Sequence, residues 1–240
     1  IFVQVALTNG LGKSIQELMK PSNDEKKTYD TATFYSISNC QEGLSRVTLG
    51  NFLIKRVVYE IQEELPHIKN FGTLSPIPGF ANWCSGVEET KLKTILGKLK
   101  NQDISFLKSP DLKLGDRRIN ENKEAITKLV AHYIVNEKNH KGLPVNDVSR
   151  FHLGNGAIVE DIVINANISE TGFKRSYGLM VNYLYELKNI ENKKKVGLIF
   201  NRYKIKNVVN LAAQAGVRYS VSHPFLPGFR VIIKLFTVGT

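Results

Sequence analysis

The chain has 240 residues, of which 42% are hydrophobic, and its 33 Lys and Arg against 22 Asp and Glu give a net charge of +11. This composition is typical of a globular protein with a sizeable core and excludes an intrinsically disordered chain. No apolar run is long enough to cross a bilayer, so we expect no membrane insertion. Cys40 and Cys84 give neither a disulfide framework nor the ligand spacing of a metal site.

The positive charge favours an anionic partner, such as nucleic acid, a membrane surface or a phosphorylated cofactor. The lysines are spread along predicted helices, and only residues 193–195 form a dense basic run. Because basic side chains normally lie in water, this spacing favours a solvated helix face. No basic surface with interleaved aromatic residues is visible, so we expect no nucleic-acid partner. The dispersed lysines include Lys91, Lys93, Lys98 and Lys100.

Strand and helix patterns alternate through the first third of the chain. Residues 1–8 (IFVQVALT) and 31–38 (TATFYSIS) predict strands, and residues 14–20 predict a short helix. The clearest helix spans residues 49–65 and ends before Pro66. Its apolar face consists of Leu49, Phe52, Leu53, Val57 and Ile61.

The rest of the chain continues the same alternation. A strand over residues 71–75 leads into a proline-rich turn, and residues 88–140 are mostly helical, including 124–137. We expect further strands over residues 157–166 and 178–187 and a final helix over residues 204–215. This order of elements predicts an α/β domain.

Residues 9–14 (NGLGKS) lie between a predicted strand and helix, as a phosphate-binding P-loop does. That loop needs a glycine five residues before Gly12, where this chain has Leu7. We therefore reject a nucleoside triphosphatase.

Ser75 opens the run Ser75 to Phe80 (SPIPGF), in which two prolines and a glycine predict a rigid turn. A turn of this kind can hold a hydroxyl in a fixed place. His152 precedes a turn that runs from Gly154 to Gly156 and leads into a predicted strand. A histidine at the start of a strand, beside a glycine turn, is well placed for proton transfer. For both residues, a purely structural role remains open on this evidence alone.

A second candidate region is the loop before the long helix. Thr48 is a plausible N-cap, and the unpaired amides of a helix N-terminus suit a pyrophosphate. Arg46 adds positive charge, and Gly50 permits a close backbone approach.

On the predicted strand over residues 178–187, the side chains of Tyr183 and Tyr185 would lie on the same face of the sheet. Core packing is the default interpretation for both rings.

Three segments together resemble malonyl-CoA decarboxylase. They are residues 34–80, which end in SPIPGF, residues 151–157 (FHLGNGA) and residues 178–185 (GLMVNYLY). They follow one another in the order and at the distances of that family. The resemblance extends over roughly residues 1–190 and is loose over residues 85–120.

The resemblance implies an acetyltransferase-like (GNAT) α/β fold with a mixed sheet flanked by helices. We expect residues 1–216 to be the catalytic domain, without its front portion and the family's N-terminal helical domain, and residues 217–240 to be a divergent tail. In the family, that helical domain helps to assemble a tetramer, so we expect a homo-oligomer.

The resemblance also implies a carboxy-lyase that converts malonyl-CoA to acetyl-CoA and carbon dioxide without a metal or organic cofactor. Ser75 and His152 match the family's catalytic serine and histidine, and Tyr185 matches an active-site tyrosine. The malonyl-CoA-binding residues are expected to be Ser75 and His152 together with Ser45, Arg46, Val47, Thr48, Leu49, Gly50 and Asn51. The basic charge would then serve the phosphates of coenzyme A.

Two departures from the family leave alternatives. Thr48 stands where the family has a glutamate, so a protein that binds CoA thioesters with reduced or lost catalysis is the second interpretation. An acetyltransferase is a third, based on fold analogy alone. The chain ends in Val238, Gly239 and Thr240 rather than in Ser-Lys-Leu, so we expect a mitochondrial matrix or cytoplasmic location rather than a peroxisome.

Overall fold

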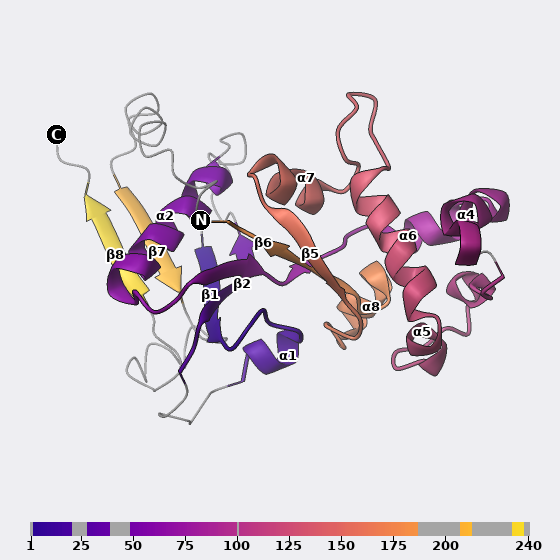
Figure 1. Ribbon diagram of the computed structural model, residues 1–240, viewed down its shortest axis with the longest axis horizontal. Coiled ribbons are helices and arrows are strands. Elements are labelled where there is room, and N and C mark those ends of the chain that lie inside the picture. Colours follow the sequence, from indigo (N-terminus) through magenta and orange to yellow (C-terminus); the bar gives the residue numbers. More distant parts are fainter. Residues whose placement is uncertain are drawn as a thin grey trace. The chain divides into compact units, whose positions relative to one another are not determined.

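A computed structural model describes residues 2–20, 28–38, 49–99, 101–186, 207–212 and 232–237. By its internal contacts the chain divides into two compact units (Figure 1). Unit 1 comprises residues 1–74 and 184–240, and unit 2 comprises residues 75–183.

Unit 1 contains a sheet of mixed strand directions. Strand β1 (Phe2–Thr8) pairs antiparallel with β2 (Thr31–Ser38), and β2 pairs parallel with β3 (Asn70–Thr73). Gly72 of β3 then pairs antiparallel with Leu184. A mixed sheet combined with helices confirms the predicted α/β class.

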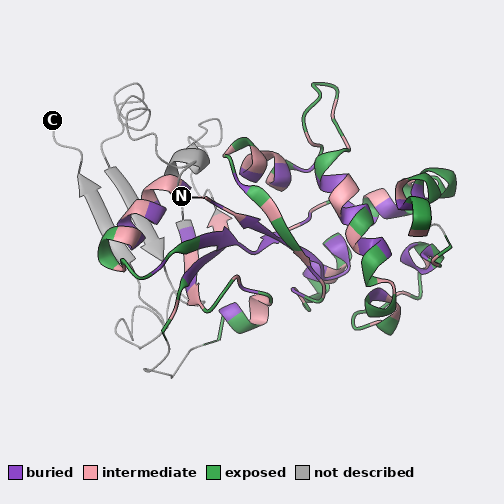
Figure 2. Ribbon diagram, in the orientation of Figure 1, coloured by how far each residue is buried: buried purple, intermediate pink, exposed green. Residues whose placement is uncertain are grey.

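The helices of unit 1 follow the sequence pattern closely. Helix α1 (Ile15–Leu18) is capped by Ser14, and α2 (Leu49–Glu64) ends before Pro66 as predicted. Along α2 the buried apolar residues recur at the spacing of one helix face, which packs into the core (Figure 2). These residues are Ile54, Val57, Val58 and Ile61.

The predicted final helix over residues 204–215 is wrong. Its described part is a strand, β7 (Asn207–Ala212), which pairs antiparallel with β8 (Ile232–Thr237). The adjacent β-branched residues Val208 and Val209 favour a strand. The pairing with a distant segment decides the conformation, and a local sequence pattern does not reveal it.

Unit 2 begins with β4 (Ser75–Pro76) and contains two further strands, β5 (Ile158–Val163) and β6 (Met180–Leu184, whose last residue belongs to unit 1). Both β4 and β5 pair with β6. The predicted strands over residues 157–166 and 178–187 are thus confirmed.

The central part of the unit 2 sequence is mostly helical, as predicted for residues 88–140. Its helices are α4 (Glu89–Leu96), η2 (Gly97–Leu99), η3 (Ser105–Lys108), α5 (Arg117–Glu121) and α6 (Lys123–Val135). Helices α4 and α5 both pack on α6 (Figure 1). One side of α6 is buried along its length (Figure 2). Three short helices were not predicted: α3 (Phe80–Gly86), α7 (Asp147–Gly154) and α8 (Glu170–Ser176).

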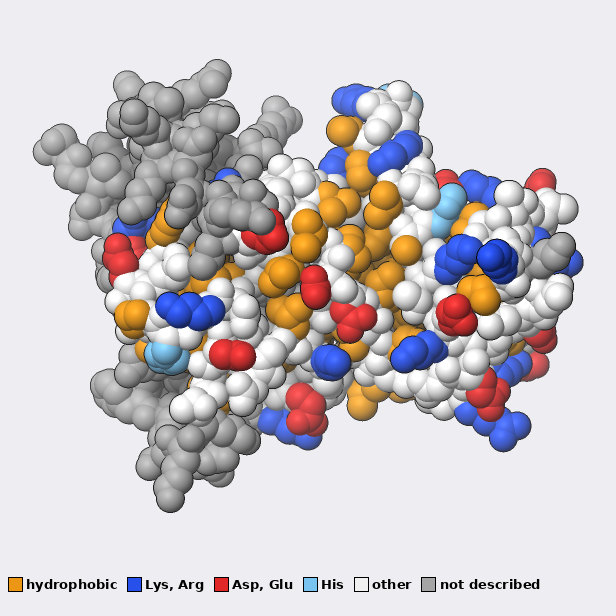
Figure 3. Space-filling model, viewed as in Figure 1, with side chains coloured by type: hydrophobic (Ala, Val, Ile, Leu, Met, Phe, Trp, Pro, Cys, Tyr) orange, Lys and Arg blue, Asp and Glu red, His pale blue; other side chains and the backbone are white. Residues whose placement is uncertain are grey.

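The lysines of α4 lie in water, as their spacing predicts. Lys91 and Lys93 are exposed and form ion pairs of 2.6 Å with Glu137 and Glu89. Figure 3 shows basic and acidic side chains interspersed on the visible face. Lys100 and residues 193–195 lie outside the described residues. No helix in the described ranges combines the length and apolar character that a membrane crossing requires.

Candidate functional site

Ser75 lies on strand β4, which agrees with the strand predicted over residues 71–75, and not within the turn that the SPIPGF run predicts. It pairs antiparallel with Val181 of β6, and the turn proper follows at Pro78 and Gly79, where Gly79 has a φ of 82°. The cause is Pro76, because a proline disfavours the helical region for the residue before it and favours extended backbone. Strand pairing therefore fixes the Ser75 backbone, and the residue is buried.

His152 lies in the last turn of helix α7 and not at the start of a strand. The helix begins at the N-cap Asn146, and the predicted glycine turn separates the helix from β5. A run with glycines at both 154 and 156 does not resemble a helix, so the sequence pattern concealed α7. The His152 side chain is buried, with 3% of its surface exposed.

The structure brings these two predicted residues into direct contact. The Oγ of Ser75 lies 3.0 Å from the Nε2 of His152 in a buried hydrogen bond between residues 77 positions apart. Burial lowers the pKa of His152 to about 3, so the ring is neutral at neutral pH. A neutral imidazole has one donor and one acceptor nitrogen, so it can either orient the hydroxyl or accept its proton.

Tyr183 supports the His152 ring, a role that the sequence did not reveal. The two rings stack with centroids 4.5 Å apart and an interplanar angle of 23°. The Tyr183 side chain also interacts with Ser149, one helical turn before His152. The alternation of side chains along β6 could have indicated this role. Val181 is the strand partner of Ser75, and Tyr183, two residues further on, lies on the same face of the sheet.

Asn155 places a further polar group directly after α7. Its backbone N–H donates to the carbonyl of His152 at 3.1 Å. Its Nδ2 atom is buried and makes no hydrogen bond within the part of the chain that the structure describes. Leaving a buried amide donor unpaired costs about 1–3 kcal/mol, so we expect this atom to donate a hydrogen bond to water or to a ligand.

The remaining predicted site residues belong to unit 1, and some of them lie outside the described residues. Tyr185 belongs to unit 1, where it is buried and its N–H donates to the carbonyl of Phe71 at 2.8 Å. Residues 45–48, which include Thr48, lie outside the described residues. Leu49, Gly50 and Asn51 form the first turn of α2, which begins where the sequence predicted.

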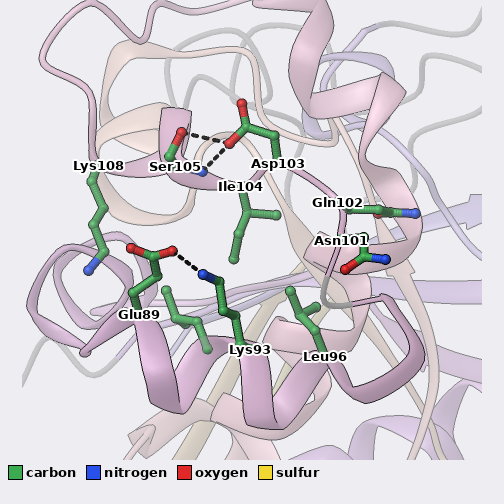
Figure 4. A pocket seen from close by; sticks show the side chains of 10 residues that line it. Glu89, Lys93, Leu96, Asn101, Gln102, Asp103, Ile104, Ser105 and Lys108 are labelled. Atoms are coloured by element: carbon green, nitrogen blue, oxygen red, sulfur yellow. Dashed lines mark hydrogen bonds and ion pairs between the residues drawn. The ribbon is translucent and has the colours of Figure 1, made fainter.

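A separate cavity in unit 2, of about 570 Å³, lies between α4 and residues 101–108 (Figure 4). Its charged groups are already engaged: Glu89 pairs with Lys93, and Asp103 accepts two hydrogen bonds from Ser105. Neither Ser75 nor His152 lines it. The cavity therefore carries none of the predicted chemistry.

Three comparisons place the chain among known proteins. The family model of the malonyl-CoA decarboxylase C-terminal domain matches residues 1–218. The mitochondrial malonyl-CoA decarboxylase of Rattus norvegicus is 37% identical over 209 residues, which cover 78% of this chain and 42% of the rat protein. That of Anser anser anser is 36% identical over 211 residues, covering 79% of this chain and 42% of the relative.

Solved structures agree with these matches. The malonyl-CoA decarboxylase of Rhodopseudomonas palustris aligns with a TM-score of 0.64 at 36% identity, covering 85% of this chain and 46% of that one. The enzyme of Cupriavidus metallidurans gives the same TM-score and identity, with 81% and 50% covered.

The chain thus spans less than half the length of the curated relatives that it matches. The matched part includes all three sequence segments described above and the buried Ser75–His152 pair. This chain belongs to the malonyl-CoA decarboxylase family and matches its C-terminal domain.

Proposed function

We propose that this protein is a carboxy-lyase that converts malonyl-CoA to acetyl-CoA and carbon dioxide and so lowers the malonyl-CoA level available to fatty acid metabolism. The observation that carries the proposal is the buried hydrogen bond of 3.0 Å between Ser75 and His152 in a chain of this family. The names of its relatives supply the substrate, since both are malonyl-CoA decarboxylases.

The reaction breaks the bond between the malonyl α-carbon and its carboxylate. The electron pair moves into the thioester as carbon dioxide leaves, which gives an enolate with negative charge on its oxygen. One proton then binds the α-carbon and gives the acetyl group, so each turnover consumes one proton from solvent. The site must therefore stabilise an oxyanion and deliver a proton.

In this proposal, the Ser75 hydroxyl contacts the malonyl group, and His152 orients that hydroxyl and relays the proton. A neutral His152 can do both, because neither task requires a permanent imidazolium. One well-placed hydrogen-bond donor to a developing oxyanion is typically worth about 3–4 kcal/mol. Tyr185 is proposed as a third catalytic residue, and residues 45–51 as the loop that binds malonyl-CoA.

The alternative of a CoA-thioester-binding protein without turnover depends on Thr48. That residue lies outside the described part of the chain, and nothing in unit 2 favours lost activity, because the Ser75–His152 pair is formed. Decarboxylation is therefore the better-supported proposal. A mitochondrial location is proposed from the names of the relatives, and a homo-oligomer from the family resemblance.

The test is carbon dioxide release from malonyl-CoA by the protein and by Ser75→Ala and His152→Ala. Each substitution is expected to lower kcat by about 100-fold or more while KM changes little. Ser85→Ala and His67→Ala are matched controls, because both residues are exposed and are not predicted site residues. Rates within a few-fold of the parent protein for both site variants would show the assigned roles to be wrong. If the parent protein binds malonyl-CoA without releasing carbon dioxide, the result would instead support the alternative of a CoA-thioester-binding protein without turnover.

A further inference from the structure

The two residues of the site reach each other from separate elements. Ser75 is held by the pairing of β4 with β6, whereas His152 is carried by α7. A hydrogen bond between nitrogen and oxygen persists only over about 2.7–3.2 Å. The position of α7 relative to the segment that follows Ser75 therefore determines whether the 3.0 Å contact forms.

The Asn146 side chain connects that segment directly to α7. Its Oδ1 accepts a hydrogen bond of 2.8 Å from the N–H of Ser149 and thereby caps the helix. Its Nδ2 donates a hydrogen bond of 2.9 Å to the carbonyl of Pro78, three residues after Ser75. Asn146 is only 2% exposed, so water does not compete strongly for either bond.

The same cap extends to the support of the His152 ring. The hydroxyl of Ser149 donates to the carbonyl of Asn146 at 3.0 Å, and the Ser149 side chain interacts with Tyr183. Tyr183 in turn stacks on His152. Asn146 is thus linked to the Ser75 segment on one side and to the surroundings of His152 on the other.

The Pro78 carbonyl is a fixed anchor for this link. It accepts a second hydrogen bond, of 2.9 Å, from the hydroxyl of Tyr133 on α6. A carbonyl oxygen has two lone pairs, and both are used here. Gly79 packs closely beside the same hydroxyl, since a Cβ at that position would lie 2.7 Å from it.

An amide is the side chain that suits this position. Aspartate and serine cap helices about as well as asparagine does. A carboxylate has no donor for the Pro78 carbonyl, however, and serine is too short to offer a second polar group. The requirement for both a cap acceptor and a donor therefore goes beyond ordinary helix capping.

We infer that Asn146 is a positioning residue that sets the distance between the Ser75 hydroxyl and the His152 ring by tying the turn after Ser75 to the start of α7. Its effect on catalysis rests on the proposed function. Its effect on the Ser75–His152 contact does not, because that contact exists without substrate.

The test is Asn146→Asp in the whole chain, read first without substrate. Histidine labelled with ¹⁵N reports the hydrogen bonding of each ring nitrogen, and His152→Gln identifies the His152 signals. Asn146→Asp is expected to shift the His152 ring signals while the other histidines keep theirs. With malonyl-CoA, kcat is expected to fall roughly 10- to 100-fold with KM within about threefold, as small misplacements of reacting groups do.

Asn122→Asp is the matched control. Asn122 is the N-cap of α6, and its Nδ2 donates to the carbonyl of Arg118 at 3.0 Å, so the substitution removes the same kind of bond elsewhere. It is expected to leave both the His152 signals and kcat unchanged. Asn146→Ser is the second site variant should aspartate prevent folding, and the same result is expected of it.

Parent-like His152 signals in the folded Asn146 variants would overturn the inference, even if their melting temperature fell. Shifted signals with an unchanged kcat would overturn its catalytic part. If the parent protein releases no carbon dioxide, the proposed function fails, and the spectra still decide whether Asn146 positions the pair.

Discussion

At the residue scale, the burial of the His152 ring determines its protonation state. A depression of the pKa from 6.5 to about 3 corresponds to roughly 4–5 kcal/mol against the charged form. The C-terminal end of a helix favours a cationic histidine by at most about 2 kcal/mol. Desolvation is therefore the larger effect, and His152 remains neutral despite its place in the last turn of α7.

This neutral state makes the stability of the protein depend on pH. Unfolded His152 binds a proton below pH 6.5, whereas folded His152 does not do so until about pH 3. Its contribution is thus complete above pH 6.5 and is lost as the pH falls toward 3, at about 1.4 kcal/mol per pH unit. Between pH 7.0 and 5.0 the parent protein should lose about 2 kcal/mol more unfolding free energy than His152→Gln, as measured by urea unfolding. Equal losses in the two proteins would show that the ring is charged or exposed in the folded state.

At the element scale, the turn after Ser75 depends on a glycine that no other residue replaces easily. Gly79 has a φ of 82°, and an added Cβ would approach the Tyr133 hydroxyl to 2.7 Å. Gly142 has a similar φ of 72°, but nothing lies within 4 Å of its Cβ position. Gly142→Ala therefore tests backbone strain alone, and Gly79→Ala adds a steric clash.

We expect Gly142→Ala to lower the unfolding free energy by about 1 kcal/mol, since an L-residue in this region costs roughly 1–2 kcal/mol. Gly79→Ala should cost clearly more, about 2–4 kcal/mol, because the turn must move away from Tyr133. Chemical denaturation of the two variants measures the difference. Similar losses would mean that the contact between the turn and Tyr133 does not constrain the fold.

The sequence predicts elements whose pattern is local. The strands β1 and β2 and the helix α2 follow from hydrophobic periodicity and from Pro66, and all three are confirmed. The strand β7 was mistaken for a helix because its conformation depends on pairing with β8. Helix α7 was missed because it is short, ends in glycine, and begins at an asparagine whose second hydrogen bond goes to the distant Pro78.

The site was also predictable only where a local sequence pattern indicates it. Ser75 and His152 stood out through their segments, but their contact joins positions 77 residues apart and depends on the fold. Tyr183 was assigned to the core, and only the structure reveals its stacking on His152. The roles of Tyr185 and residues 45–51 stay predictions.

At the scale of the whole molecule, the net charge of +11 suits a substrate that carries several phosphate charges. Long-range attraction between exposed charges is screened over about 10 Å at 0.1 M salt. KM for malonyl-CoA should therefore rise severalfold between about 0.05 and 0.3 M KCl, while kcat changes little. Steady-state kinetics at several salt concentrations measures both constants. A KM that does not depend on salt would argue against a role for the basic charge in binding.

Ser75 and His152 are proposed to act as one unit in the decarboxylation of malonyl-CoA. A double-mutant cycle on kcat for carbon dioxide release tests it most directly, with Ser75→Ala, His152→Ala and the double variant. Residues that act as a unit are strongly non-additive, so the double variant should be about as slow as the slower single variant. Losses that simply multiply, or single variants that retain the parent rate, would show that the two residues do not act as a unit in catalysis.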